Sequence, residues 1–413
     1  MTTPNTTDSQ RAHSPLEVEV TASFDEWIGE SSVYWSDKRD AWIVTGYAEA
    51  AKILKDSTTF WRDIPLRDGN VEFWGRHLLN LEGRDHRRMH SMHMKLTGET
   101  FAEDIRARAN EICRQVSKRL VKQGRAELCA NYANTVVFLL GCGFVGYDST
   151  DESFLAELLV HMEVRAAWKE ALHAGKGISL ESKIAQNGIA ALKAMEAMLM
   201  PIIRERRQNP CDDLISKLWE KGPSVFPDWT EQDVLSTCWS SIDNETKPLL
   251  RGLLYALCRD PELQARLRND PSLVTGFVEE GLRFLTPFRT LRRVVKKDVE
   301  IGGQTMRSGD FIYLITPLAN TDEERWACPH QFNIEREQEA THFAFGYGQG
   351  YCVGRYVGRV EAAEAVKALL AETSTFGLDP EGAKPVWDGE MYHSVSPIHV
   401  ILQEWRRLMK VRA

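Results

Sequence analysis

The 413-residue sequence has no long hydrophobic run and no excess of basic charge. Its longest apolar-leaning stretch, residues 136–147, is interrupted by glycines and is shorter than the roughly 20 residues that a membrane-spanning helix needs. Lysine and arginine number 51 against 59 acidic residues, and this net charge of −8 disfavours nucleic-acid binding through overall charge. The polar segment 1–15 resembles neither a signal peptide nor an anchor. We therefore expect a cytoplasmic protein that binds no membrane and no nucleic acid.

None of the eight cysteines forms a CxxC pair, which excludes a disulfide framework and the common zinc patterns. The sequence also shows no internal repeat and no low-complexity linker. Hydrophobic residues make up 43% and charged residues 27%, which is typical of globular proteins. We expect a disordered N-terminus over residues 1–15 and a single domain over residues 16–413, because no interior boundary is marked.

Helical patterns dominate the sequence between residues 98 and 260, with breaks at glycine and proline. Strand-like patterns cover residues 41–44, 291–295, 299–301 and 310–315. Long helical runs with a small sheet predict a mainly α fold with a minor antiparallel β region.

One predicted helix, residues 231–259, is long enough to cross most of a domain of this size. Thr230 and Asp233 form a start similar to a capping box. Pro248 lies in its interior, where it has no N–H to donate and crowds the preceding turn. We expect the helix to bend or open around residues 242–244.

Cys352 differs from the other seven cysteines in its surroundings. It ends a glycine-rich segment, 342–354, and stands directly before a predicted helix over residues 354–373. Because a helix N-terminus favours negative charge, this position predicts a lowered thiol pKa and a role as nucleophile or metal ligand. The alternative is a buried cysteine in a glycine-rich turn.

Four residues in this segment occur at a spacing that is specific to one kind of loop. Phe345, Gly346, Cys352 and Gly354 together resemble the haem-binding loop of the cytochrome P450 family of haem-thiolate monooxygenases. The resemblance implies that Cys352 is the axial ligand of the iron of haem b, with Phe345 beside the sulfur.

Two further motifs agree with this resemblance. Glu280 and Arg283 resemble the ExxR pair of the family, and at this spacing on a helix they share a face and can form an ion pair. The stretch from Ala319 to Arg336 resembles the segment that follows, and makes Arg336 the third member of the ion-pair network. The resemblance covers residues 80–375 and implies the cytochrome P450 fold.

The resemblance also implies basic residues that hold the two haem propionates. The corresponding positions here are His86, His90, Arg293 and His342. The family usually has arginine at the position of His90, so Arg87 or Arg88 could take this role. Two other readings of the basic segment 84–95 remain open: a solvated face, and metal binding by His86, His90 and His93.

Within the long helix, Glu245 and Thr246 match the acid–alcohol pair of the family, which relays protons during oxygen activation. Ile242 and Asp243 replace the usual small residue and glycine. The Asp243 carboxylate either reaches the distal pocket or turns away and caps the opening caused by Pro248.

Substrate contacts are inferred from family positions alone. The candidates are Trp61, Phe73, Trp74, Trp239, Ile242, Asp243, Phe288, Arg289 and Tyr392. As a set they suggest an apolar or aromatic substrate with one polar group near Asp243 or Arg289.

The sequence therefore predicts a monooxygenase of secondary metabolism or catabolism that inserts one atom of O2 into a small organic molecule. A ferredoxin or flavodoxin-type partner and its reductase would supply electrons, ultimately from NAD(P)H, and Arg355 and Arg359 could meet that acidic partner. Two alternatives remain: an atypical reaction such as oxidative coupling, nitration or peroxide-driven oxidation, and a non-catalytic haem sensor.

Overall fold

The computed structural model describes residues 14–62, 75–147, 151–174, 179–242, 245–337 and 341–404. Three of the predicted substrate-contact residues, Phe73, Trp74 and Asp243, lie outside these ranges, as do residues 1–13. Helix α1 begins at Pro15 with Ser14 as its N-cap, so the predicted disordered segment is at least two residues too long.

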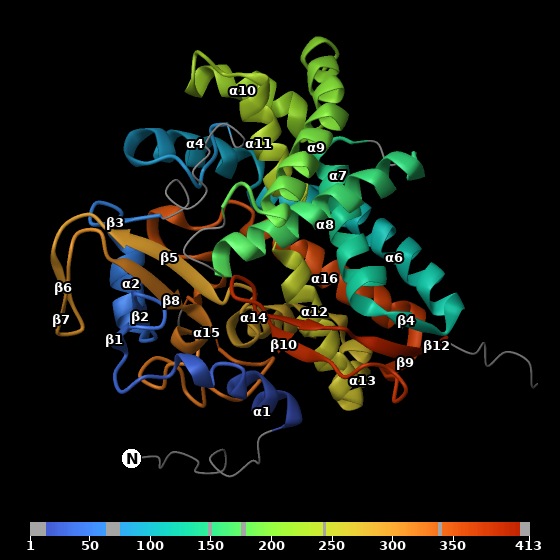
Figure 1. The fold of residues 1–413 in the computed structure, drawn as a ribbon. Coiled ribbons are helices and arrows are strands. Elements are labelled where there is room, and N and C mark those ends of the chain that lie inside the picture. Colours follow the sequence, from blue (N-terminus) through green and yellow to red (C-terminus); the bar gives the residue numbers. More distant parts are fainter. Residues whose placement is uncertain are drawn as a thin grey trace, which may run out of the picture.

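Helices form most of the described chain (Figure 1). They are α1 (Pro15–Ala22), α2 (Tyr47–Lys55), α4 (Gly83–Leu96), α5 (Glu99–Asp104), α6 (Arg106–Gln123), α7 (Thr135–Val145), α8 (Glu152–Ala174), α9 (Lys183–Gln208), α10 (Leu214–Val225), α11 (Glu231–Ile242), α12 (Thr246–Arg259), α13 (Pro261–Asn269), α14 (Val274–Phe284), α15 (Thr316–Ala319) and α16 (Arg355–Glu372). Within the described residues, no helix is long and apolar enough to span a membrane.

The largest sheet joins strands near the N-terminus to strands from residues 290–315, and in Figure 1 its blue and orange strands lie side by side. Its order is β1 (Val33–Ser36), β2 (Ala41–Val44), β8 (Phe311–Ile315), β5 (Thr290–Val295) and β3 (Phe60–Trp61). The expected strands near residues 41, 291 and 310 are confirmed. The pairing differs in one respect, because β2 and β8 run parallel while the other pairs are antiparallel.

Three smaller sheets complete the β structure. The hairpin of β6 (Val299–Ile301) and β7 (Gln304–Met306) turns through Gly302 and Gly303, both with positive φ, as the sequence predicts. Sequence patterns missed the other two, formed by β4 (Arg125–Glu127), β12 (His399–Glu404) and β9 (Thr373–Leu378), and by β10 (Val386–Asp388) and β11 (Ser394–Ser396). β4, β10 and β11 have three residues each, and β9 and β12 have six each without a regular alternation of polar and apolar residues, so their pairing reveals them.

The long helix is divided, as the proline predicts. Helix α11 ends at Ile242 and α12 begins at Thr246. Pro248 is the third residue of α12, where a missing N–H leaves no hydrogen bond unmade. The end of α11 also packs closely on α7, since a Cβ on Gly141 would lie 2.7 Å from the Cα of Ile242.

The break coincides with a boundary in the hydrophobic core. Buried residues of α11 pack with α7, α8, α9 and α10 in one cluster. Buried residues of α12 pack with α6, α14 and α16 in another. Figure 1 shows the first group of helices in the upper part of the view and α12, α14 and α16 below it. The two parts of the divided helix therefore pack in different clusters.

Candidate functional site

The Cys352 segment is a tight loop between a 3-10 turn, Phe343–Phe345, and α16. The Cys352 amide donates a 2.9 Å hydrogen bond to the carbonyl of Phe345, which closes the loop. Gly348 has a φ of +68°, and a Cβ there would lie 2.9 Å from the carbonyl oxygen of Leu54 in α2. Gly346 also has positive φ. The backbone conformation of Gly346 and Gly348 therefore explains why both positions are occupied by glycine.

Cys352 is an exposed residue, unlike the five buried cysteines, but its thiol is desolvated. Burial raises the pKa of the thiol and the carboxylate of Glu245 acts in the same direction, so that the pKa is about 11. The Gly354 amide, Arg355 and Arg359 lower the pKa without overcoming this effect. The predicted lowering of the thiol pKa by the helix N-terminus is therefore wrong for the protein alone.

Glu245 lies close enough to Cys352 for its carboxylate to raise the pKa of the thiol. Glu245 lies at the start of α12 and is held by two other elements. The hydroxyl of Tyr392, in the turn between β10 and β11, donates a 3.1 Å hydrogen bond to Glu245 Oε1. The Nζ atom of Lys169 on α8 lies 3.9 Å from the same oxygen.

Thr246 points towards α16. Its hydroxyl donates a 2.6 Å hydrogen bond to Oε2 of Glu361, which is 1% exposed. A Cβ on Gly358 would lie 3.3 Å from the Thr246 hydroxyl, so this glycine permits the close approach of α12 and α16. Sequence analysis missed Glu361, although a carboxylate between Val360 and Ala362 in the apolar stripe of α16 was a signal.

Basic side chains gather on the other side of the Cys352 loop. The Nε2 atom of His90 in α4 lies 2.8 Å from the carbonyl of Tyr351 and donates to it. His86, one turn earlier, accepts a 3.2 Å hydrogen bond at Nε2 from Arg62, a residue that sequence analysis did not single out. Arg293 is half-buried on β5 and donates to the carbonyl of Arg292.

His342 has a different environment from the one expected. Its Nδ1 atom accepts from the Ala344 amide, and its Nε2 atom lies 3.4 Å from Glu279. Glu279 also forms two hydrogen bonds with Arg359. Both ring nitrogens of His342 are therefore engaged within the protein, and the structure does not support contact with a propionate.

The structure also distinguishes between the two other interpretations of segment 84–95, a metal site and a solvated face. The described residues contain no group of three or more His, Cys, Asp or Glu side chains able to hold a metal ion, so the His86–His90–His93 site is not supported. Arg84 and Arg87 are exposed, as a solvated face predicts. The guanidinium of Arg88 lies against the ring of Phe226. These arginines therefore do not replace His90.

The described substrate-contact candidates fall into four groups. Phe288 and Tyr392 form a bridge with ring centroids 5.0 Å apart, beside Glu245. Trp239 and Ile242 are fully buried in α11. Arg289 points away from this group, because its guanidinium lies over Phe24 and 3.8 Å from Glu26. Trp61 is half-buried in β3 with Lys296 over its ring.

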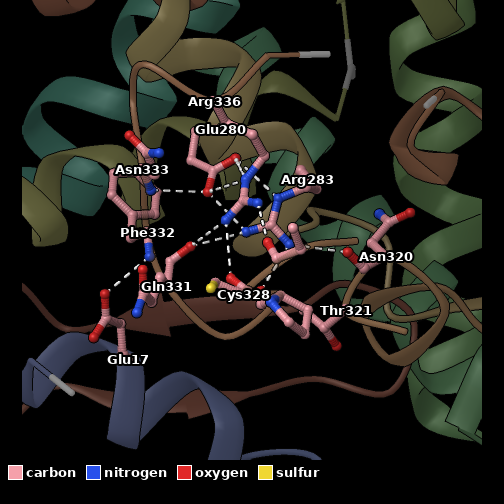
Figure 2. Close-up of polar contacts among 12 residues, drawn as sticks. Glu17, Glu280, Arg283, Asn320, Thr321, Cys328, Gln331, Phe332, Asn333 and Arg336 are labelled. Atoms are coloured by element: carbon pink, nitrogen blue, oxygen red, sulfur yellow. Dashed lines mark hydrogen bonds and ion pairs between the residues drawn. The ribbon is translucent and has the colours of Figure 1, made fainter. Parts of the chain in front are cut away.

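The Glu280–Arg283 pair lies at the centre of a buried network (Figure 2). Arg283 forms two hydrogen bonds with Glu280, of 2.7 and 2.9 Å, and Arg336 adds a 3.2 Å contact to the same carboxylate. Arg283 also donates to the carbonyls of Asn320, Pro329 and Gln331. The arrangement joins α14 to the irregular segment before the Cys352 loop.

Comparison with known proteins gives the family. The family model described as Cytochrome P450 matches residues 18–388. The chain belongs to the cytochrome P450 family. It is therefore an oxidoreductase of the haem-dependent monooxygenase family, and the predicted fold is confirmed.

Several bacterial cytochromes P450 are similar to this chain. The biotin biosynthesis cytochrome P450 of Bacillus subtilis is 27% identical over 351 residues, covering 83% of this chain and 85% of the relative. The 6-deoxyerythronolide B hydroxylase of Saccharopolyspora erythraea is 24% identical over 366 residues, covering 84% of this chain and 87% of the relative. The solved structure of P450BioI with an acyl carrier protein superposes with a TM-score of 0.80 at 23% identity, covering 94% of this chain and all of that one.

The donor set of this cytochrome P450 fits a haem. The thiol of Cys352 stands just before α16, with Glu245 close enough to affect its ionisation. On another side of the loop, Arg62, His86 and His90 form a basic group, and within the described residues none of them forms an ion pair with an acidic side chain. A thiol ligand for iron and a basic wall for two carboxylates are the two requirements of this cofactor.

Proposed function

We propose that the chain is a haem-thiolate monooxygenase in which Cys352 is the axial ligand and Glu245 and Thr246 supply protons. The observation that carries the proposal is the packing of the start of α12 on α16, the helix that follows Cys352, where Thr246 donates to Glu361 and Gly358 allows the close approach. The bound haem supplies the oxygen-activating chemistry. In the overall reaction one atom of O2 enters a C–H bond of the substrate and the other leaves as water, with two electrons and two protons consumed.

Different side chains around the Cys352 loop would bind different parts of the cofactor. Cys352 would give its thiolate to the iron, and the Gly354 amide would hydrogen-bond the sulfur and tune it. Phe345 packs beside Arg359, whose guanidinium lies 4.6 Å from the ring centroid. His86, His90 and Arg293 would face the propionates, while His342 is not retained in this role.

Proton delivery would pass through the start of α12. Glu245 and Thr246 are adjacent in sequence but have different partners, Tyr392 for the acid and Glu361 for the alcohol. The buried carboxylate of Glu361 accepts from the Thr246 hydroxyl and so fixes its orientation. The hydroxyl and Glu245 would then hold and pass protons through water, which is general acid catalysis by groups set in place before substrate arrives.

We propose an apolar or aromatic substrate that packs against Phe288, Tyr392 and the end of α11. A polar group on the substrate would face α8 rather than Arg289. Lys169 supports this assignment, because its Nζ atom lies 5.5 Å from the ring centroid of Tyr392. Arg165 lies one turn earlier, with its guanidinium carbon 5.9 Å from the ring centroid of Trp239.

We also propose that a ferredoxin or flavodoxin-type protein supplies the electrons, ultimately from NAD(P)H. Arg355 is the better candidate for contact with an acidic partner, because Arg359 is already paired with Glu279. The relatives that act on 6-deoxyerythronolide B and in biotin biosynthesis, by their names, support a role in bacterial secondary metabolism or biosynthesis.

A second candidate is an atypical oxidation on the same fold. The break between α11 and α12 and the missing small-residue–glycine pair favour it, since they alter the part of the helix that carries Glu245. Oxidative coupling, nitration or peroxide-driven oxidation would each give products that differ in mass from a hydroxylated one.

The test begins with the reduced carbon monoxide difference spectrum of the purified holoenzyme. We expect the signature of thiolate ligation in the natural protein and in Cys211→Ser, an exposed cysteine outside the site, and its loss in Cys352→Ala. Retention of the signature in Cys352→Ala would overturn the proposal. Mass spectrometry of products formed with ferredoxin and reductase, or with peroxide alone, then separates hydroxylation from the atypical reactions.

A further inference from the structure

Arg62 is a desolvated cation without an acidic partner among the described residues. It follows β3, and its Nη1 atom donates a 3.1 Å hydrogen bond to the carbonyl of Leu78. Its Nη2 atom donates to the Nε2 atom of His86 at 3.2 Å. Burial lowers the pKa of Arg62, and the more distant Glu82 only partly opposes this, since Glu82 is paired with Lys296. A buried guanidinium bound only to neutral groups lacks the anion that normally balances it.

The guanidinium lies directly against the Cys352 loop. A Cβ on Gly350 would lie 2.4 Å from Nη2 of Arg62, and the Cβ atoms of real side chains essentially never approach another heavy atom this closely. Gly350 does not have positive φ, so backbone conformation does not require glycine here. A side chain at position 350 would therefore require the flexible end of Arg62 to move.

The neighbouring imidazoles strengthen this picture. Burial, together with the nearby Arg62, His90 and Arg87, lowers the pKa of His86 to about 4. His86 is therefore neutral near pH 7 and leaves the positive charge of this wall on Arg62. His90 is engaged by the Tyr351 carbonyl.

We propose that Arg62 holds a haem propionate in this protein and that Gly350 makes room for it. The inference rests on haem binding by this family and assigns the residue that balances one of its carboxylates. A planar guanidinium can bind a carboxylate through two parallel hydrogen bonds, which gives it an advantage over an imidazole at this place. The His86 contact orients the guanidinium towards the loop.

The experiment measures the rate of haem release from the holoenzyme to excess apomyoglobin. We expect Arg62→Gln to release haem about tenfold faster than the natural protein, since it loses a charge-assisted hydrogen-bond pair. Arg62→Lys should fall between the two. Arg84→Ala, an exposed cation on α4, should release haem at the natural rate. All variants should keep the thiolate spectral signature, because Cys352 is unchanged.

A double variant separates cofactor binding from a structural role. Arg62→Ala vacates the space over Gly350, so adding Gly350→His should return a basic group to the loop and slow haem release again. Gly350→His alone should clash with Arg62 and weaken haem binding.

Unchanged haem release in Arg62→Gln would overturn the proposal. So would faster release together with an equally lowered unfolding temperature of the apoprotein and no recovery in the double variant. Absence of haem from the natural protein would instead contradict the proposed function on which this inference rests.

Discussion

The hydroxyl of Tyr392 donates a 3.1 Å hydrogen bond to Oε1 of Glu245. Tyr392 lies between β10 and β11 near the end of the described chain, and Glu245 lies at the start of α12. Tyr392 also contacts Phe288 and lies beneath Lys169. Tyr392, which we propose contacts the substrate, thus also hydrogen-bonds to Glu245, the acid of the proposed proton relay.

This contact predicts the behaviour of Tyr392→Phe. The variant keeps the aromatic packing on Phe288 but loses one hydrogen bond to a carboxylate, worth about 1 kcal/mol or about fivefold. We expect the ratio of product to hydrogen peroxide formed to fall by about that factor, with the substrate-induced spin shift retained. Phe288→Leu is the matched control, which should weaken substrate binding and leave the ratio unchanged. Equal product ratios in Tyr392→Phe and the natural enzyme would contradict the role of Tyr392.

Glu361 offers a test of the second half of the relay. Glu361→Gln keeps the shape and can still accept from the Thr246 hydroxyl, but it removes the negative charge. We expect product formation to fall about tenfold or more, with an altered pH profile and unchanged substrate binding. Glu364→Gln is the control on the same helix, since Glu364 is also buried but pairs with Arg106 and Lys367. It should lower the unfolding temperature without changing the pH profile; equal slowing in both variants would show that Glu361 acts only structurally.

The Arg283 network predicts a large effect on stability. Arg283 is 0% exposed, and its removal leaves the carbonyls of Asn320 and Pro329 without this donor and leaves Glu280 with Arg336 as its remaining cation. We expect Arg283→Ala to lower the free energy of unfolding by about 3–5 kcal/mol. Lys38→Ala, which breaks an ion pair of a lysine whose side chain is 78% exposed, should change it by less than about 1 kcal/mol. Denaturant unfolding of the two variants measures both values, and similar small changes would contradict the prediction.

The buried histidines predict a loss of stability in acid. Burial lowers the pKa of His393 from 6.5 to about 3, and only the Leu285 carbonyl raises it in part. Between pH 6.5 and 3 the unfolded chain therefore binds a proton that the folded chain does not, and stability falls as pH decreases. We expect His393→Gln to remove about 1.4 kcal/mol per pH unit from this slope near pH 5. The measurement is denaturant unfolding at several pH values, and identical slopes would show that His393 does not contribute.

Several features of the site could be predicted because they depend on local sequence. The glycines around Cys352 require a tight loop, and Pro248 requires the helix to stop before it. Glu280 and Arg283 are three residues apart on one helix, so their contact follows from helix geometry alone. The N-cap of α11 is also local, since Thr230 and Asp233 bond to one another as expected.

Other features depend on which segments meet, and these were missed or misassigned. Arg289 was expected near the substrate, but while Phe288 pairs with Tyr392 in an isolated bridge, the guanidinium of Arg289 lies over Phe24. His342 was expected near a propionate, yet it meets Glu279 across α14.

The amino-acid sequence alone determined the family motifs, the break in the central helix and the loop that presents Cys352, because each arises within a few consecutive residues. Only the tertiary structure decided that Arg62 lies over Gly350, that Glu361 accepts from Thr246 and that Tyr392 holds Glu245. Each of these contacts joins residues far apart in the chain, and no local propensity specifies which distant side chain will fill the space beside them.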